Sequence, residues 1–211
     1  LGAYRADGKT YTAQRTIAVQ RSEYVTVVQT RASLPNEIGG VVWMTPLPAD
    51  AGWFVPLYIG VTELNPSITI EKCGDRFEFR RDSYRWAVGS LSTYMNLKWQ
   101  PMYADMSKIR DKYEGELVRN QAAFEKAVLE LYNKDKAAAI KYLTDFSYKT
   151  VDTFREAVWQ TLDYLVWKYD MGFVTENGRV VSKGYPATWI EQLFKYNFGT
   201  SDIRGWSQYV A

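Results

Sequence analysis

The chain has 211 residues, of which 46% are hydrophobic, 16% aromatic and 24% charged, a composition that suits one sizeable domain or two small ones. Its 26 basic and 24 acidic residues leave a formal net charge of +2, which argues against nucleic-acid binding because phosphate recognition needs clustered positive charge. No apolar run approaches the length of a membrane span.

Residues 10–80 have the pattern of a strand-rich region, in which runs of Val, Thr, Tyr and Trp alternate with turn residues. Residues 14–21 alternate between apolar and polar side chains, whereas residues 24–29 are more continuously apolar, which favours a strand covered on both faces. The meander is expected to continue in four further strands, over residues 41–45, 53–59, 67–71 and 76–79.

Between Leu34 and Tyr58 the sequence contains residues that are unusual within β-strands. Proline gives up a ladder donor, so Pro56 predicts that its strand lies at a sheet edge or a bulge. Adjacent Gly39 and Gly40 indicate either a positive φ or a close approach that a Cβ would prevent. Taken by itself, this spacing favours a bulged hairpin in an ordinary sheet.

From Asp82 onward the apolar period becomes helical. Asp82 or Ser83 is expected to cap a first helix that Pro101 ends, and a long helix follows over residues 103–133. A shorter helix capped by Asp135 is expected to reach about residue 145. The remaining elements are a helix from Thr150 or Asp152 to about residue 172, a hairpin around Asn177-Gly178, and a last short helix from Pro186 that carries Trp189, Leu193 and Phe194.

A block of strands followed by a block of helices predicts an α+β fold, an antiparallel sheet meander followed by a helical block. We interpret residues 1–211 as a single domain fragment, mainly strands over 10–80, mainly helices over 82–170, and a hairpin with a short terminal helix over 171–211. The strands are rich enough in apolar residues that the second face of the sheet is expected to need a partner from outside this chain.

Three short motifs resemble a known family. They are LPNEIGGVVW over residues 34–43, VPLY over residues 55–58 and DSYRW over residues 82–86. In this order they are similar to the C-terminal half of the cysteine-type dipeptidases of the N-terminal-nucleophile hydrolase superfamily, a family that includes secernin-like proteins. The first motif is the most specific. The resemblance covers roughly residues 11–100 well and the helical remainder loosely.

The resemblance implies a four-layer αββα fold and hydrolysis of short peptides by an N-terminal cysteine that processing exposes. The free α-amino group serves as the base, so such an enzyme needs no histidine. The family's nucleophile stands at the front of a longer chain, whereas this sequence begins with Leu1. We therefore expect a fragment whose partners are a short peptide and the missing N-terminal half. The protein could also form a homo-oligomer. Its location is left open between the bacterial cytoplasm and export.

The sequence contains one cysteine and no histidine, which excludes an internal disulfide, a Cys-rich zinc site and the Ser-His and Cys-His dyads. Catalysis by this chain alone would have to use carboxylates, lysine, tyrosine or a metal on oxygen ligands. We expect no cofactor and no metal. Cys73 follows Lys72 but has no histidine to act as its base, so we interpret it as a structural or incidental thiol.

Two groups of residues are candidates for the site. In related amidases an arginine on a strand of the later half approaches the nucleophile, and the resemblance implies that Arg15 is the closest match here, followed by Arg21. The alternative is a pair of surface arginines. Expected residues of a substrate pocket are Glu37, Gly39, Gly40, Trp43 and Tyr58. Glu37 alternatively fixes the turn, and the aromatic residues alternatively form core.

Two functions therefore stay open. One is the C-terminal portion of a dipeptidase whose cysteine nucleophile lies outside this chain, which leaves the chain alone inactive. The other is a non-catalytic binding or structural module that kept the fold and uses the aromatic surface near Trp43 and Trp53 as a contact.

Overall fold

The computed structural model describes residues 3–6, 8–12, 19, 22–69, 78–182, 187–188, 191 and 195. The expected strand over residues 14–21 lies outside these residues except for residue 19, as does most of the expected helix from Pro186. The strands expected over residues 67–71 and 76–79 are described only in part, and there the prediction is wrong, because residues 67 and 68 belong to a 3₁₀ turn and residues 78 and 79 belong to no strand. The chain divides into two compact units, Leu1–Tyr164 and Leu165–Ala211.

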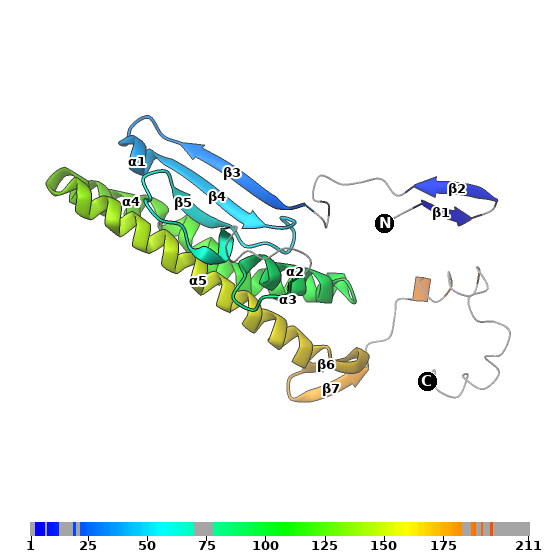
Figure 1. Cartoon of the computed structure of the whole chain (residues 1–211). Coiled ribbons are helices and arrows are strands. Elements are labelled where there is room, and N and C mark those ends of the chain that lie inside the picture. The colour runs from blue at the N-terminus through cyan, green and yellow to red at the C-terminus, as the bar shows by residue number, and fades with distance from the viewer. Residues whose placement is uncertain are drawn as a thin grey trace. The chain divides into compact units, whose positions relative to one another are not determined.

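The first unit begins with a two-stranded antiparallel hairpin of β1 (Ala3–Ala6) and β2 (Lys9–Thr12). Its main sheet has three antiparallel strands in the order β3 (Tyr24–Thr30), β4 (Gly40–Pro46) and β5 (Val55–Tyr58) (Figure 1). A single helical turn, α1 (Asn36–Gly39), links β3 to β4. Pro56 lies on β5, an edge of this sheet in the described part of the chain, as its missing donor predicts.

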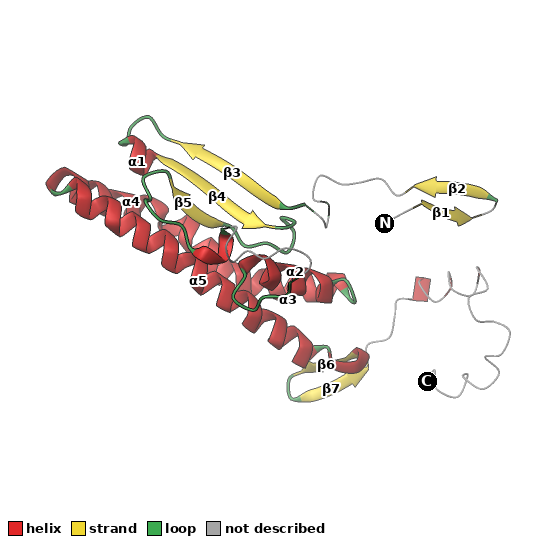
Figure 2. Cartoon of the chain, viewed as in Figure 1, coloured by secondary structure: helices red, strands yellow, loops and turns green. Residues whose placement is uncertain are grey.

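Helices form the second layer and lie against one face of the sheet (Figure 2). After the 3₁₀ turn η1 (Pro66–Ile68) they are α2 (Tyr84–Met95), α3 (Trp99–Arg110), the π-helical segment η2 (Asp111–Gly115), α4 (Glu116–Lys134) and α5 (Lys136–Lys168). The predicted α+β order of an antiparallel sheet followed by helices is confirmed. Within the described residues, no helix is both long enough and apolar enough to cross a bilayer.

Helix α2 forms as its pattern predicts. The Ser83 side chain accepts a hydrogen bond from the Trp86 N–H at 3.2 Å, so Ser83 rather than Asp82 is the N-cap. Pro101 does not end this helix, and that prediction is wrong. The break falls over residues 96–98, and Pro101 lies in the first turn of α3, where the missing N–H needs no intrahelical acceptor.

The prediction of two helices between residues 135 and 172 is also wrong, because α5 runs without a break through Thr150 and Asp152. Asp135 does cap it, accepting the Ala138 N–H at 3.0 Å. The Thr150 hydroxyl donates to the Phe146 carbonyl four residues earlier, at 2.8 Å. A threonine bonded back in this way is compatible with a helix interior, although the same residue type is common at helix starts.

In the second unit, the 3₁₀ turn η3 (Asp170–Gly172) is followed by β6 (Phe173–Glu176) and β7 (Arg179–Ser182), which pair antiparallel. The turn residues Asn177 and Gly178 have φ of 50° and 72°. Positive φ at both positions is the type I′ geometry that Asn-Gly favours, so the predicted hairpin is confirmed.

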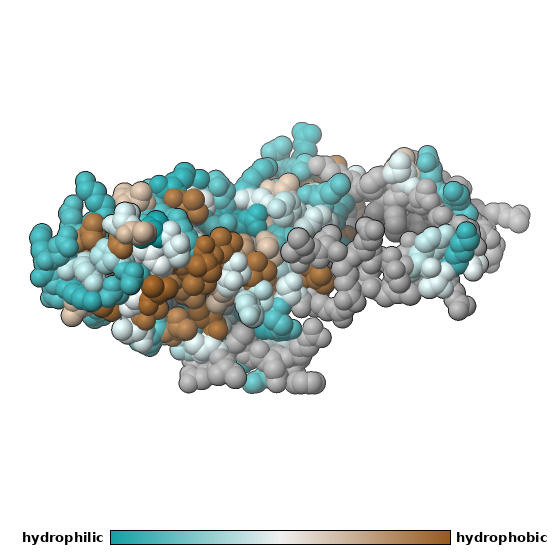
Figure 3. Space-filling model, turned by 90° about the horizontal axis from the view of Figure 1, so that it is seen from above, coloured by the Kyte–Doolittle hydropathy of each residue, from teal (hydrophilic) through white to brown (hydrophobic). Residues whose placement is uncertain are grey.

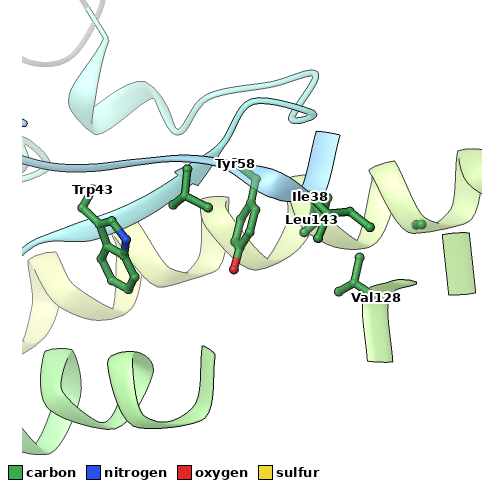
Figure 4. Close-up of a cluster of buried hydrophobic side chains, with 7 residues drawn as sticks. Ile38, Trp43, Tyr58, Val128 and Leu143 are labelled. Carbon is green, nitrogen blue, oxygen red and sulfur yellow. The ribbon is translucent and has the colours of Figure 1, made fainter. Parts of the chain in front are cut away.

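The hydrophobic core of the first unit lies between the inner face of the sheet and the α4–α5 pair. Trp43 and Tyr58 point from the strands toward the helices, where Val128 and Leu143 lie, with Ile38 of α1 beside them (Figure 4). All five side chains are buried. Residues that alternate along β4 share this face, as the two-residue period of a strand requires.

The outer face of the same sheet is apolar and exposed. Tyr24 and Val28 of β3 are 68% and 66% exposed, which contradicts the prediction that residues 24–29 are covered on both faces. The register places Val28 beside Val42, and Val42 beside Leu57. Hydrophobic side chains gather on the side of the molecule that carries the sheet (Figure 3). The expectation that this face needs a partner agrees with its exposure.

Gly39 and Gly40 permit a close approach. Neither glycine has a positive φ, so the first of the two alternatives that the sequence indicated is wrong. A Cβ on Gly39 would stand 2.6 Å from the Arg31 carbonyl oxygen, and one on Gly40 would stand 2.6 Å from Cδ1 of Ile59. The first neighbour is backbone, whereas the second is the end of an exposed side chain that has room to move.

We therefore expect Gly39→Ala to be the more damaging of the two alanine substitutions. It should lower the free energy of unfolding by about 1–3 kcal/mol because the clash is with backbone. Gly40→Ala should cost less than about 1 kcal/mol, since Ile59 can rotate away. Urea denaturation of both variants measures the difference, and the reverse order would contradict this account of the glycine pair.

Candidate functional site

A network of polar side chains is enclosed between the sheet and α4. Its centre is Glu125, a carboxylate that is 5% exposed. Oε1 of Glu125 accepts hydrogen bonds from the Arg31 guanidinium, from the Tyr58 hydroxyl at 3.0 Å and from Nε2 of Gln121 at 2.9 Å. Nη2 of Arg31 also donates to the Ile38 carbonyl at 3.0 Å. Glu125 of α4 thus binds side chains from the end of β3, from β5 and from the preceding turn of its own helix.

A second acceptor extends this network across the sheet. Oε1 of Gln29 accepts from Nε1 of Trp43 at 3.2 Å and from Nε2 of Gln121 at 2.8 Å. The indole N–H of Trp43 is therefore satisfied inside the core. Gln121 bridges the two acceptors, so six side chains form one connected set.

Burial and the neighbouring Glu125 carboxylate raise the pKa of Tyr58 far above its usual range, so the phenol is neutral and acts as a donor. Glu125 is held by Arg31, whose Nε and Nη1 atoms are buried without a hydrogen-bond partner among the described residues. The network therefore contains no nucleophile and no free base. It can fix the sheet on α4 and shape a cavity.

A cavity of about 110 Å³ adjoins the network. Strand residues Trp43, Pro56 and Tyr58 form one wall. The helix side is lined by Leu117, Asn120, Gln121, Phe124 and Phe146. Because most of its surface is aromatic or aliphatic, and Trp43, Tyr58 and Gln121 use their polar atoms in the network, the cavity suits an apolar group.

The structure separates the predicted pocket residues. Trp43 and Tyr58 lie together in the core and at the cavity, whereas Glu37 binds elsewhere. Its Oε1 is 2.6 Å from Nζ of Lys136, and its Oε2 accepts the Tyr132 hydroxyl at 3.1 Å. The hydrogen bond from Lys136 is the main cause that lowers the pKa of Glu37. Glu37 thus ties α1 to the turn between α4 and α5.

Gly39 ends α1 and Gly40 begins β4, and they pack against Arg31 and Ile59. The predicted Arg15 and Arg21 lie outside the described residues, as does Cys73. Sequence reasoning missed Arg31, Gln29, Gln121 and Glu125. A signal for Glu125 exists, because this charged residue falls within the apolar stripe of α4, between Phe124 and Val128.

A second polar arrangement holds the loop that joins β4 to β5. The Tyr84 hydroxyl donates to the Trp53 carbonyl at 2.6 Å, and Oε2 of Glu114 accepts the Phe54 N–H at 2.6 Å. Nη1 of Arg110 lies 3.3 Å from the carbonyl oxygens of residues 50 and 52. Glu114 belongs to the π-helical segment, a type of helix that is frequent at functional sites.

Burial raises the pKa of Glu114, while the Phe54 N–H and Arg110 oppose that shift. A partly buried carboxylate with a raised pKa is a common feature of active sites, and here its acceptor oxygen is already bonded to backbone. Within the described part of the chain, no three His, Cys, Asp or Glu side chains are grouped so that they could hold a metal ion.

Comparison with known proteins places half of the chain in a family. A family model described as peptidase family C69 matches residues 2–112, which run from the first hairpin through α3 into the π-helical segment. No curated protein matches the sequence. Glu114, Gln121 and Glu125 follow the matched residues, so the helical side of the polar network lies outside the match.

The buried ion pair should be costly to break from the arginine side. Arg31→Met should lower the free energy of unfolding by about 3 kcal/mol, because it leaves the Glu125 carboxylate buried without its counter-charge. Glu125→Gln should cost less, since an amide oxygen still accepts from Arg31 and Tyr58. Equal losses for the two variants, measured by chemical denaturation at pH 7, would contradict the asymmetry.

Glu114 should make stability depend on pH. Its pKa is raised on folding, so its favourable contribution is present below the ordinary value of 4.5 and is lost as the pH rises through the folded-state pKa. Glu114→Gln keeps an acceptor for Phe54 and cannot ionise. The variant should match the parent in unfolding free energy at pH 4 and exceed it at pH 7–8. A gap that does not change between pH 4 and pH 8 would refute this assignment.

Proposed function

Because the chain belongs to peptidase family C69, we propose that it is the C-terminal portion of a dipeptidase that hydrolyses short peptides through an N-terminal cysteine lying outside this chain. The observation that carries the proposal is the family match over residues 2–112, which includes the LPNEIGGVVW motif. The match supports a peptidase, and the preference for dipeptides and the cysteine's position are our proposal.

The proposed reaction is acyl transfer to sulfur followed by hydrolysis. The α-amino group takes the thiol proton, and the thiolate attacks the scissile carbonyl carbon. The C–N bond breaks as the proton passes to the leaving amine, which leaves a thioester. Water then attacks the thioester and releases the acid and the thiol. This scheme needs no histidine, and the sequence contains none.

In this proposal the chain supplies a sheet and one wall of the substrate pocket. The outer face of the sheet, which is exposed on β3 and half-buried on β4 and β5, supports a second sheet stacked on it, as in the four-layer αββα arrangement. That sheet would come from the N-terminal half of the parent protein. Such a layer would bury Val28 and Tyr24, which are exposed here.

The proposed pocket wall is the start of β4. Gly39 and Gly40 let the chain pass close to Arg31 and Ile59, and Glu37 anchors the turn before them. Trp43 and Tyr58 face the helices, so their proposed role is to position this strand from behind rather than to contact peptide. Arg15 is proposed to stabilise the charge that develops near the nucleophile, with Arg21 the second choice.

The competing function is a non-catalytic binding or structural module. It is favoured by one observation: the polar network between sheet and helices is bonded to itself and presents no free base. A complete parent protein that lacks a processed N-terminal cysteine would support this function. A parent that begins its mature chain with cysteine would support the dipeptidase.

We expect the purified 211-residue chain to show no dipeptide hydrolysis. In the complete protein, Cys73→Ser should leave kcat/KM within about threefold of the parent, which is well under the 1.4 kcal/mol that a tenfold change represents. The matched variant replaces the proposed N-terminal cysteine by serine and should abolish turnover. Hydrolysis by the 211-residue chain that disappears in Cys73→Ser would overturn the proposed mechanism.

A further inference from the structure

A groove of about 680 Å³ lies between the start of α4 and the middle of α5, two antiparallel helices that run side by side (Figure 1). This volume falls within the range of about 300–1,000 Å³ that is usual for small-molecule sites. The floor is aromatic and aliphatic, and it is formed by Tyr113, Leu117, Tyr142, Phe146 and Phe154. None of the predicted pocket residues lines this groove.

The floor of the groove is only partly covered by the protein. Tyr142 is 50% exposed, and Tyr113, Leu117 and Phe146 are half-buried. The Phe124 ring stacks on Phe146 and on Tyr142, with centroids 4.1 Å and 5.8 Å apart, so the aromatic side chains of the α5 side are held in place. A ligand with apolar side chains would remove this surface from water.

The rims of the groove carry two cations and two anions. On the α5 side, Asp145 accepts a hydrogen bond from Lys141 at 2.7 Å, and this bond, together with the charge of Lys149, lowers the pKa of Asp145. On the α4 side, Lys112 and Glu116 are exposed, and neither forms an ion pair with another described residue. The α4 rim therefore offers one cation and one anion to a ligand, while the charges of the α5 rim already act on each other.

The spacing of these two charges suits a particular ligand length. Lys112 and Glu116 are four positions apart along a helical segment, which places their Cβ atoms on one face and roughly 5–6 Å from each other. An extended dipeptide has its ammonium and carboxylate groups at about 6–7 Å, since each residue spans about 3.5 Å. The ends of a single amino acid are closer together, and those of an extended tripeptide are about 10 Å apart.

We propose that this groove binds a dipeptide that has free ends and apolar side chains. The ammonium group lies at Glu116, the carboxylate lies at Lys112, and the side chains cover Leu117 and Phe146. The hydroxyl of Thr153, on the other rim, is an uncharged group that can donate to or accept from the peptide bond of the ligand.

Charge complementarity favours this occupant over a singly charged molecule of the same shape. A ligand with only a carboxylate would leave Glu116 without a partner, and one with only an ammonium group would leave Lys112 without one. Because ion pairs at exposed positions contribute little each, every end of the ligand is expected to change the affinity only a few-fold. The proposal involves no chemical step and concerns a different surface from the proposed peptidase site, so either proposal can fail while the other stands.

The test compares leucylleucine with N-acetyl-leucylleucine, leucylleucine amide and the peptide capped at both ends. Calorimetry on the 211-residue chain gives the dissociation constants, and amide chemical shifts locate the site at Tyr113, Leu117 and Phe146. Each single cap should weaken binding at least threefold, and both caps together should weaken it more than either alone. Leucine and trileucine should bind more weakly than leucylleucine.

Two variants assign the ends of the ligand. Lys112→Met should weaken leucylleucine at least threefold without weakening leucylleucine amide, which has no carboxylate to lose. Glu116→Gln should weaken leucylleucine to a similar extent without weakening N-acetyl-leucylleucine. Both residues are exposed, so the melting temperature should stay unchanged.

The matched control is the double variant Lys126→Met, Glu130→Gln, which removes an exposed pair of α4 that has the same spacing and does not line the groove. It should leave all four affinities within twofold. Equal affinity for leucylleucine and its doubly capped form, chemical shifts elsewhere in the chain, or no saturable binding at millimolar leucylleucine would each overturn the proposal.

Discussion

The ion pair of Arg31 and Glu125 is the contact on which the arrangement of the first unit depends. It joins the end of β3 to the middle of α4, two positions that are 94 residues apart in the chain. Glu125 also receives Tyr58 and Gln121, so strand, turn and helix meet at one carboxylate oxygen. A buried pair acts chiefly through the cost of breaking it, and it therefore restricts the sheet to one position on the helix.

The polar network also connects residues inside the family match with residues that follow it in the chain. The sheet, α2 and α3 lie within residues 2–112, whereas the helices that cover the inner face of the sheet come afterwards. Trp43 and Tyr58 are buried by Val128 and Leu143, which lie beyond the match. Part of the matched sheet thus depends, for its burial, on a helical hairpin that the match does not include.

The elements that sequence predicts well are those determined by local chemistry. Asn177-Gly178 requires positive φ at both positions, and Ser83 caps α2 through its own side chain. Errors arise where tertiary contacts decide. Thr150 bonds back to the Phe146 carbonyl within α5 instead of capping a new helix, and Val28 is exposed although its run is apolar. For the candidate site, sequence points to Trp43 and Tyr58, but the partners that hold them come from α4, and a single sequence carries no record of that pairing.

Strand β3 has a consequence for protein handled in solution. Its seven residues include no charge and no proline, and among the described strands it pairs only with β4. A flat, uncharged strand edge next to an apolar surface is a template on which the same strand of another molecule can pair. We therefore expect the isolated chain to self-associate through this edge, to an extent that grows with concentration.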